Sequence, residues 1–151
     1  MTEHQMYEAI AHYLQMKYPN VLYRFDLAAD LKLTMGQARK HKMLHPRRGW
    51  PDLFIAEPKH KWCRDGSLGI YMGLAGDGET PIYSMVFGGL FLELKRDKTR
   101  LKKKNGEWAT PHIAEQAEML EKLRNKGYRA EFAVGLDEAM KMIDDYLGGG
   151  E

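Results

Sequence analysis

The stretch Leu90–Lys95, which reads Leu-Phe-Leu-Glu-Leu-Lys, constrains the fold of this chain more than any other part of its sequence. Its alternation predicts a β-strand with three leucines on one face and Phe91, Glu93 and Lys95 on the other. Charges in so apolar a strand are costly unless they pair with each other or hold a metal ion. The stretch therefore indicates a sheet strand that carries chemistry, with a Glu93–Lys95 pair on an exposed sheet face as the alternative.

Hydrophobic periodicity on either side predicts alternating helices and strands. Capping-box patterns at Thr2 and Thr34 start helices that end near Tyr18 and Leu44. Thr110 starts a third helix that Gly127 ends, and Asp137 starts the last. The strands are predicted at 21–28, 52–56, 90–95 and 128–134. The order α-β-α-β-(insert)-β-α-β-α indicates an α/β fold with a mixed β-sheet flanked by helices.

The length of 151 residues fits one domain. We predict a single domain over 1–147 with an insertion at about 57–87, and a flexible tail at 148–151. Within the insertion, Gly69–Leu74 and Ile82–Phe87 are candidates for the strands of a hairpin.

Charge is distributed very unevenly behind a net value of only +2. Residues 31–64 carry +7 and residues 95–104 carry +6, whereas residues 112–151 carry −4. The two basic segments flank the strands that bear Asp52 and Glu93. Because Lys and Arg release counterions from phosphates, this pattern favours a polyanionic partner. For residues 95–104 alone, a solvated loop is the alternative.

Several classes of protein are excluded. No apolar run approaches the ~20 residues of a membrane helix, and the N-terminal residues lack the features of a signal peptide. The single Cys63 excludes an internal disulfide, so we expect a cytoplasmic protein that does not engage a membrane. The glycines at 73–78 lack a following Gly-Lys-Ser/Thr, and we expect no organic cofactor. His41 and His45 have a spacing that zinc accepts, but a basic helix face is favoured because no third ligand is near.

The sequence Gly49-Trp50-Pro51-Asp52 places an acid at the first position of a strand. If that strand pairs with residues 90–95, Asp52 and Glu93 converge on one cation. Mg²⁺ or Mn²⁺ would suit such carboxylates, and the Leu94 carbonyl could be a further ligand. Lys95 could then hold an attacking water or offset negative charge in the transition state. This set indicates metal-assisted hydrolysis of a phosphodiester.

A series of motifs along nearly the whole chain, except about 57–86, extends this interpretation. The series resembles the VRR-Nuc family of the PD-(D/E)xK nuclease superfamily, in particular its small stand-alone phage members. The matching stretches are Thr2-Glu3-His4-Gln5, Gly49-Trp50-Pro51-Asp52, Gly88 through Lys95, Gln116, Lys126-Gly127-Tyr128 and Gly135 through Leu147. The long gap between Asp52 and Glu93 departs from the family pattern, as does the approach Arg47-Arg48-Gly49-Trp50.

The resemblance implies a restriction-endonuclease-like core and a metal-dependent nuclease acting in the cytoplasm of a phage or prophage host. It also implies a homodimer that cuts branched DNA such as Holliday junctions. The roles that it implies are metal ligation by Asp52 and Glu93, catalysis by Lys95, ordering of the site by Gln116, and a first-helix acid at Glu3.

Glu8 competes with Glu3 for the role of the first-helix acid. At about 100° per residue, Glu3 lies on the core-facing side with Met6 and Ile10, whereas Glu8 falls outside that stripe. Helical geometry therefore favours Glu3, with a simple favourable interaction with the helix dipole as the alternative.

The hypothesis from sequence is a DNA endonuclease that uses Mg²⁺ or Mn²⁺ and selects branched duplexes. Alternatives are a non-catalytic nucleic-acid-binding module on the same fold and a restriction-type nuclease that reads a sequence. Trp50 could stack on DNA or pack in the core. The residues expected to hold the DNA backbone are Arg47, Arg48, Arg96, Lys98, Arg100, Lys102, Lys103 and Lys104.

Overall fold

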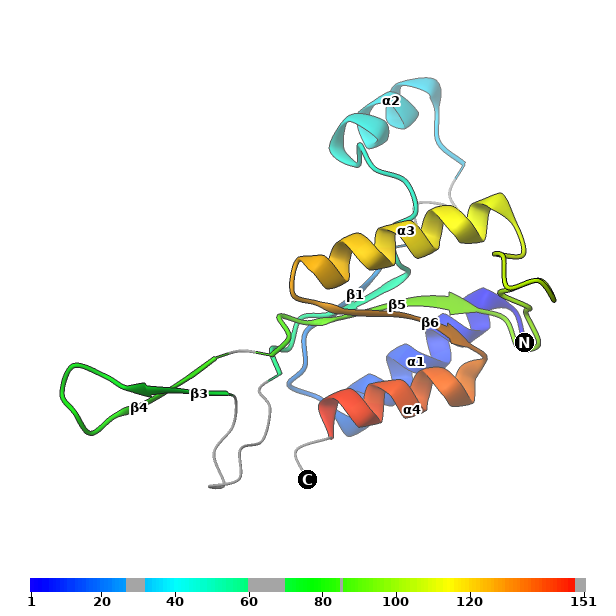
Figure 1. Cartoon of the computed structure of the whole chain (residues 1–151). Coiled ribbons are helices and arrows are strands. Elements are labelled where there is room, and N and C mark those ends of the chain that lie inside the picture. Colours follow the sequence, from blue (N-terminus) through cyan, green and yellow to red (C-terminus); the bar gives the residue numbers. More distant parts are fainter. Residues whose placement is uncertain (27–31, 60–69, 85, 149–151) are drawn as a thin grey trace.

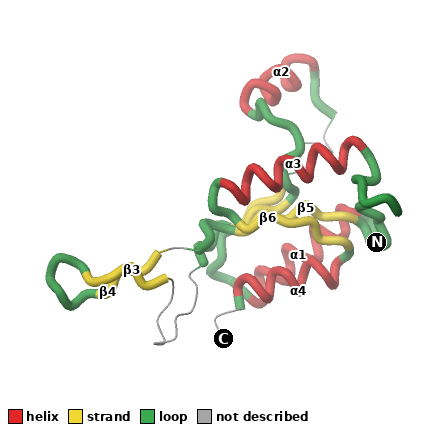
Figure 2. The backbone as a smooth tube through the Cα atoms, in the orientation of Figure 1, coloured by secondary structure: helices red, strands yellow, loops and turns green. Residues whose placement is uncertain are grey.

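The structure, a computed structural model, describes residues 1–26, 32–59, 70–84 and 86–148 (Figures 1 and 2). The elements in chain order are α1 (Glu3–Lys17), β1 (Tyr23–Phe25), α2 (Met35–Leu44), β2 (Leu53–Ile55), β3 (Ile70–Leu74), β4 (Pro81–Ser84), β5 (Leu90–Lys95), α3 (Pro111–Asn125), β6 (Arg129–Val134) and α4 (Leu136–Leu147). None of the helices so described is both long enough and apolar enough to cross a membrane.

Local capping chemistry sets the beginnings of three helices as predicted. The Thr2 and Thr34 side chains each accept a hydrogen bond from the backbone three residues on, and the Gln there bonds back, which completes both capping boxes. Thr110 caps α3, and Pro111 occupies its first turn. α4 begins at Leu136, one residue before the predicted start, with Gly135 at the cap.

The central sheet is mixed, as the sequence predicted. Its order is β1-β2-β5-β6, with β1, β2 and β5 antiparallel and β5 parallel to β6. Leu53 pairs with Leu92, so the chain entering β2 brings Asp52 beside the Glu93 end of β5. The register thus produces the convergence on which the sequence-based site depends.

Each face of the sheet packs against helices, α1 and α4 on one side and α3 on the other (Figure 1). Leu90, Leu92 and Leu94 are buried with α1 and α4, whereas Phe91 is buried with α3. The predicted alternation of β5 is therefore confirmed. Glu93, on the α3 side, is one of two polar residues buried among the described residues, and Gln116 of α3 is the other.

The insertion contains a hairpin, as expected, in which β3 pairs antiparallel with β4. It projects away from the central sheet in Figure 1, and a bridge between Lys59 and Phe87 closes its base. The second hairpin strand ends at Ser84, earlier than predicted, because Phe87 serves that bridge instead.

Other boundaries also differ from the predictions. The first strand is limited to Tyr23–Phe25, the residues that pair with β2, although Leu22 and Asp26 each make one backbone hydrogen bond to the chain beside β2. The predicted positions 27 and 28 lie outside the described residues. The predicted start of the hairpin at Gly69 and the tail residues 149–151 lie outside the described residues too.

In α4, Tyr146 is fully buried, whereas Met140 and Leu147 are only half-buried. The Tyr146 hydroxyl explains its position, because it donates a hydrogen bond to the Glu57 carbonyl at 2.6 Å.

Candidate active site

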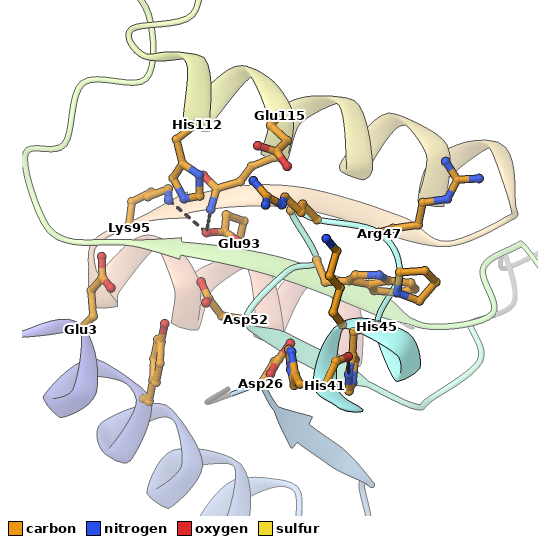
Figure 3. A pocket seen from close by; sticks show the side chains of 17 residues that line it. Glu3, Asp26, His41, His45, Arg47, Asp52, Glu93, Lys95, His112 and Glu115 are labelled. Carbon is orange, nitrogen blue, oxygen red and sulfur yellow. Dashed lines mark hydrogen bonds and ion pairs between the residues drawn. The ribbon is translucent and has the colours of Figure 1, made fainter. Parts of the chain in front are cut away.

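A cleft of about 710 Å³ opens beside the end of β5, between the beginning of α1, the α2 segment and the first turns of α3. Figure 3 shows its side chains converging from these elements. Its acidic lining residues are Glu3, Asp26, Asp52, Glu93 and Glu115. Its basic and histidine lining residues are His41, Lys42, His45, Arg47, Arg48, Lys95 and His112.

Glu93 lies at the bottom of the cleft with only 3% of its surface exposed. Its Oε1 atom accepts hydrogen bonds from Lys95 Nζ at 3.0 Å and from Gln116 Nε2 at 2.5 Å (Figure 3). Among the described residues, nothing donates a hydrogen bond to its second oxygen, Oε2, or to Gln116 Oε1, although both atoms are buried. The Asp52 carboxyl is close enough to share a proton with Glu93, and a cation bound there would take the place of that proton.

Asp52 meets Glu93 from the neighbouring strand. Its Oδ2 atom accepts a hydrogen bond from the Leu94 N–H at 2.8 Å. The N–H and C=O of one strand residue point toward the same neighbouring strand, so the Leu94 carbonyl also faces the Asp52 side. Tyr7 lies close enough for its hydroxyl to stabilise the Asp52 carboxylate as a hydrogen-bond donor.

Burial dominates the electrostatics of this carboxylate pair. Desolvation, followed by the negative charge of Asp52, raises the pKa of Glu93 from 4.5 to about 8, against the opposing effect of Lys95. Burial also raises the pKa of Asp52, although the Leu94 N–H, Tyr7 and Lys95 favour its ionised form. Desolvation and the same Asp52 charge raise the pKa of Tyr7, which therefore stays a neutral donor at physiological pH. A buried and a half-buried carboxylate that resist ionisation together are a setting in which a cation is strongly favoured.

Glu3 and Glu8 occupy different environments. Glu3 lines the cleft from the first turn of α1. Glu8 is exposed and pairs with His4 at 3.2 Å between Nε2 and Oε1. The structure thus brings Glu3, and not Glu8, together with Asp52 and Glu93.

The donor set would hold a divalent ion through two carboxylates. Among the described residues, no group of three His, Cys, Asp or Glu side chains is close enough to hold a metal ion by itself. Mg²⁺ is commonly bound by one or two carboxylates and keeps several waters. Asp52, Glu93 and the Leu94 carbonyl fit that kind of shell, and the Glu93 Oε2 atom is available for it. The rings of His41 and His45 stack with centroids 4.3 Å apart, and no third zinc ligand joins them within the part of the chain described.

The predicted DNA-binding residues are divided between the cleft and the loop that follows β5. Arg47 and Arg48 line the cleft, whereas Arg96 lines a separate cavity of about 220 Å³ beside Gly135. The loop that follows β5 contains the other five, which are exposed: Lys98, Arg100, Lys102, Lys103 and Lys104. Lys102 Nζ lies 4.7 Å from the centre of the Trp108 ring, so part of this basic loop is held against the protein itself.

Other lining residues were not singled out from the sequence. Tyr7 follows Glu3 by one helical turn, and His112 precedes Gln116 by one turn, so helical spacing from a known site residue could have found both. Lys42 of α2 could not have been found in this way, because α2 buries none of its residues and its place depends on the chain around it. His41 and His45, the residue that caps α2, were considered from the sequence only as a zinc pair, and their place in the cleft depends on the fold in the same way.

Comparison with known proteins adds a fold assignment. No protein family profile and no curated protein matches the chain. A solved structure described as a "VRR_NUC domain protein" aligns with 98% of this chain and 89% of its own, with a TM-score of 0.57 and 22% sequence identity. The resemblance predicted from the motifs is confirmed at the level of the fold, since this chain has the fold of a VRR_NUC domain protein.

Proposed function

We propose that this protein is a metal-dependent DNA endonuclease with a restriction-endonuclease-like core. The observation that carries the proposal is the convergence of Asp52 and Glu93 in an open cleft, with Lys95 bonded to Glu93. A purely structural ion pair would not require a second, half-buried acid beside it, nor a buried carboxylate oxygen to which no protein group of the described residues donates.

Each residue of the cleft has a role that follows from its contacts. Asp52, Glu93 and the Leu94 carbonyl would hold Mg²⁺ or Mn²⁺, which supplies a Lewis acid and lowers the pKa of a bound water. Gln116 fixes the Glu93 carboxylate through its 2.5 Å hydrogen bond, and is a positioning residue. The Lys95 ammonium is the group that can orient the attacking water or offset negative charge at the phosphate. Glu3 faces the same space from α1.

The basic wall explains how a polyanion reaches an acidic site. Arg47, which follows α2, lies on the side of the cleft opposite Glu3 (Figure 3), and Arg48 and Lys42 line the same cleft with two more positive charges. These groups can hold phosphates without reading bases, which suits an enzyme selective for DNA shape. We extend the proposal to branched duplexes such as Holliday junctions, cut by a homodimer, because two-fold symmetry presents two sites to two strands.

The test uses labelled four-way junction, splayed and linear duplexes with Mg²⁺, Mn²⁺ or EDTA. We expect cutting with either metal and none in EDTA, and at least a hundredfold loss in Asp52→Asn and Lys95→Ala. Lys141→Ala is the matched control, because Lys141 is exposed on α4. Cutting that survives both substitutions would overturn the site. DNA binding without cutting in every metal would instead establish a non-catalytic binding module.

Preference among substrates tests the finer proposal separately. A structure-selective enzyme should cut the junction at least tenfold faster than the linear duplex at equal concentration. Equal rates on both would contradict branch selectivity, and cutting of the linear duplex at one sequence would support a restriction-type nuclease. Sedimentation of the free protein as a monomer at micromolar concentration would contradict the homodimer.

A further inference from the structure

Another cavity, of about 310 Å³, adjoins the cleft and has a different chemistry from it. Aromatic rings form much of its wall. Phe54 stacks on Phe91 with ring centres 4.4 Å apart, and Trp50 lies 5.9 Å from Phe91 at a tilted angle. Trp50 is 42% exposed, although a large aromatic side chain usually stabilises a fold by being buried. The sequence allowed Trp50 either to stack on DNA or to pack in the core, and the structure presents an aromatic surface that is open to a ligand.

This aromatic cavity shares a wall with the cleft. Trp50, Asp26 and His45 line both spaces. Trp50 precedes the candidate metal ligand Asp52 by two residues, and only the buried Pro51 separates them. Figure 3 shows Asp26 and His45 on the side of Asp52 that faces α2. A strand with one phosphate at Asp52 and Glu93 would therefore have a neighbouring nucleotide at this cavity.

From this juxtaposition we propose that the aromatic cavity binds an unpaired nucleobase of the DNA strand being cut, stacked on Trp50. The inference rests on the proposed nuclease function and specifies its substrate. Bases present flat π-faces that stack on aromatic side chains irrespective of sequence. The rim also carries Arg24 and His45, whose donors can meet the polar edge of a base.

The occupant has to be unpaired for a geometric reason. A base inside a duplex is covered on both faces by its neighbours, so it cannot stack on Trp50 unless it leaves the helix. Unpaired bases occur at bulges, frayed ends and branch points. The cavity would therefore favour cutting beside such positions, even though the basic wall of the cleft contacts only the backbone.

The experiment measures binding in EDTA, so that no strand is cut. One duplex carries a single bulged thymidine, and a second carries an abasic residue at the same position. Wild-type protein should bind the thymidine bulge about 5- to 150-fold more tightly, which is the range for stacking one base on an aromatic side chain. Trp50→Ala should bind both duplexes equally, whereas Trp50→Phe should keep most of the preference.

Trp108→Phe is the matched control, because Trp108 packs on Phe132 and lines neither space. Tryptophan fluorescence gives a second readout that does not depend on Trp50→Ala being folded. Quenching by the thymidine bulge should fall in Trp50→Phe and keep its wild-type size in Trp108→Phe. Equal wild-type binding to both duplexes would overturn the proposal, as would quenching of the same size in wild type and Trp50→Phe.

The two proposals fail in different ways. A base preference that depends on Trp50, together with no cutting in any metal, would overturn the endonuclease and leave the nucleobase site standing. Metal-dependent cutting with no preference for the thymidine bulge would overturn the nucleobase site alone.

Discussion

The substitution Glu93→Gln should stabilise the metal-free fold at high pH, although it removes a residue of the proposed site. The pKa of Glu93 is raised from 4.5 to about 8, so the folded chain binds this proton more tightly than the unfolded chain does. The free energy of unfolding therefore falls as pH rises from about 4.5 to about 8, and above that range the full loss is present. A glutamine, which does not titrate, escapes this loss.

The magnitude follows from the same pKa. Each tenfold change in proton affinity is worth about 1.4 kcal/mol, so an ionised Glu93 costs the folded chain at most about 5 kcal/mol above pH 8. The Lys95 ion pair is already contained in this figure because it lowers the same pKa. Water in the open cleft screens part of the cost, so we expect Glu93→Gln to gain about 2–4 kcal/mol at pH 9. At pH 5 both proteins carry a neutral group there, and their stabilities should nearly coincide.

Urea unfolding in EDTA at several pH values between about 5 and 9 measures the difference between the two proteins. Taking the difference removes the titration of groups that do not interact with Glu93, whereas Asp52, which interacts with it directly, contributes to the measured difference. Glu8→Gln is the matched control, because Glu8 is exposed, and its difference should stay within about 0.5 kcal/mol. A difference that does not change with pH, or a Glu93→Gln protein less stable than wild type at pH 9, would refute the reasoning.

Three further predictions concern other parts of the fold. Gly49→Ala should lower the free energy of unfolding by about 1–3 kcal/mol, measured in urea. Gly49 has φ +82°, which disfavours alanine, and an added Cβ would lie 3.1 Å from the Glu115 carbonyl oxygen. An unchanged free energy of unfolding would contradict this prediction. Asp144→Asn should cost about 1–3 kcal/mol in the same assay, because Asp144 accepts hydrogen bonds from the Tyr13 hydroxyl of α1 and, at 2.6 Å, from the hydroxyl of Tyr18, which follows that helix; a loss below about 0.5 kcal/mol would count against it. Arg48→Gln should reduce the slope of log Kd against log salt by about 1 for all duplexes alike; an unchanged slope would remove Arg48 from the DNA contact.

Features encoded locally could be predicted from the sequence. The capping boxes at Thr2 and Thr34 depend on residues three apart, so both helix starts are correct to the residue. The same holds for Leu90–Lys95, whose alternation matches the two cores on either side of β5. Asp52 and Glu93 could be brought together because pairing of two predicted strands was the only long-range assumption required.

Features that depend on distant packing could not be predicted. Tyr146 is buried through a hydrogen bond to Glu57, which is remote in sequence, and no periodicity of α4 indicates it over Leu147. The position of the α2 residues relative to the cleft could not be predicted either, because the basic residues of this segment look alike in sequence. Only the fold distinguishes Lys42, which lines the cleft, from Lys40, which does not.

The acidic and basic residues that line the same cleft suggest a physical reason for the uneven charge of the sequence. The metal site proposed at Asp52 and Glu93 would repel phosphate whenever the carboxylates are ionised, so the proposed nuclease would need compensating positive charge nearby. The core cannot supply it, because buried cations would pair with those same acids, as Lys95 already does. The compensation therefore has to come from an element that remains in water, and α2 buries no residue at all. A helix of ten residues without such packing is marginal by itself, so phosphate on the adjacent wall would add to its stability. The basic segment is thus best understood as the counterpart of the acidic site.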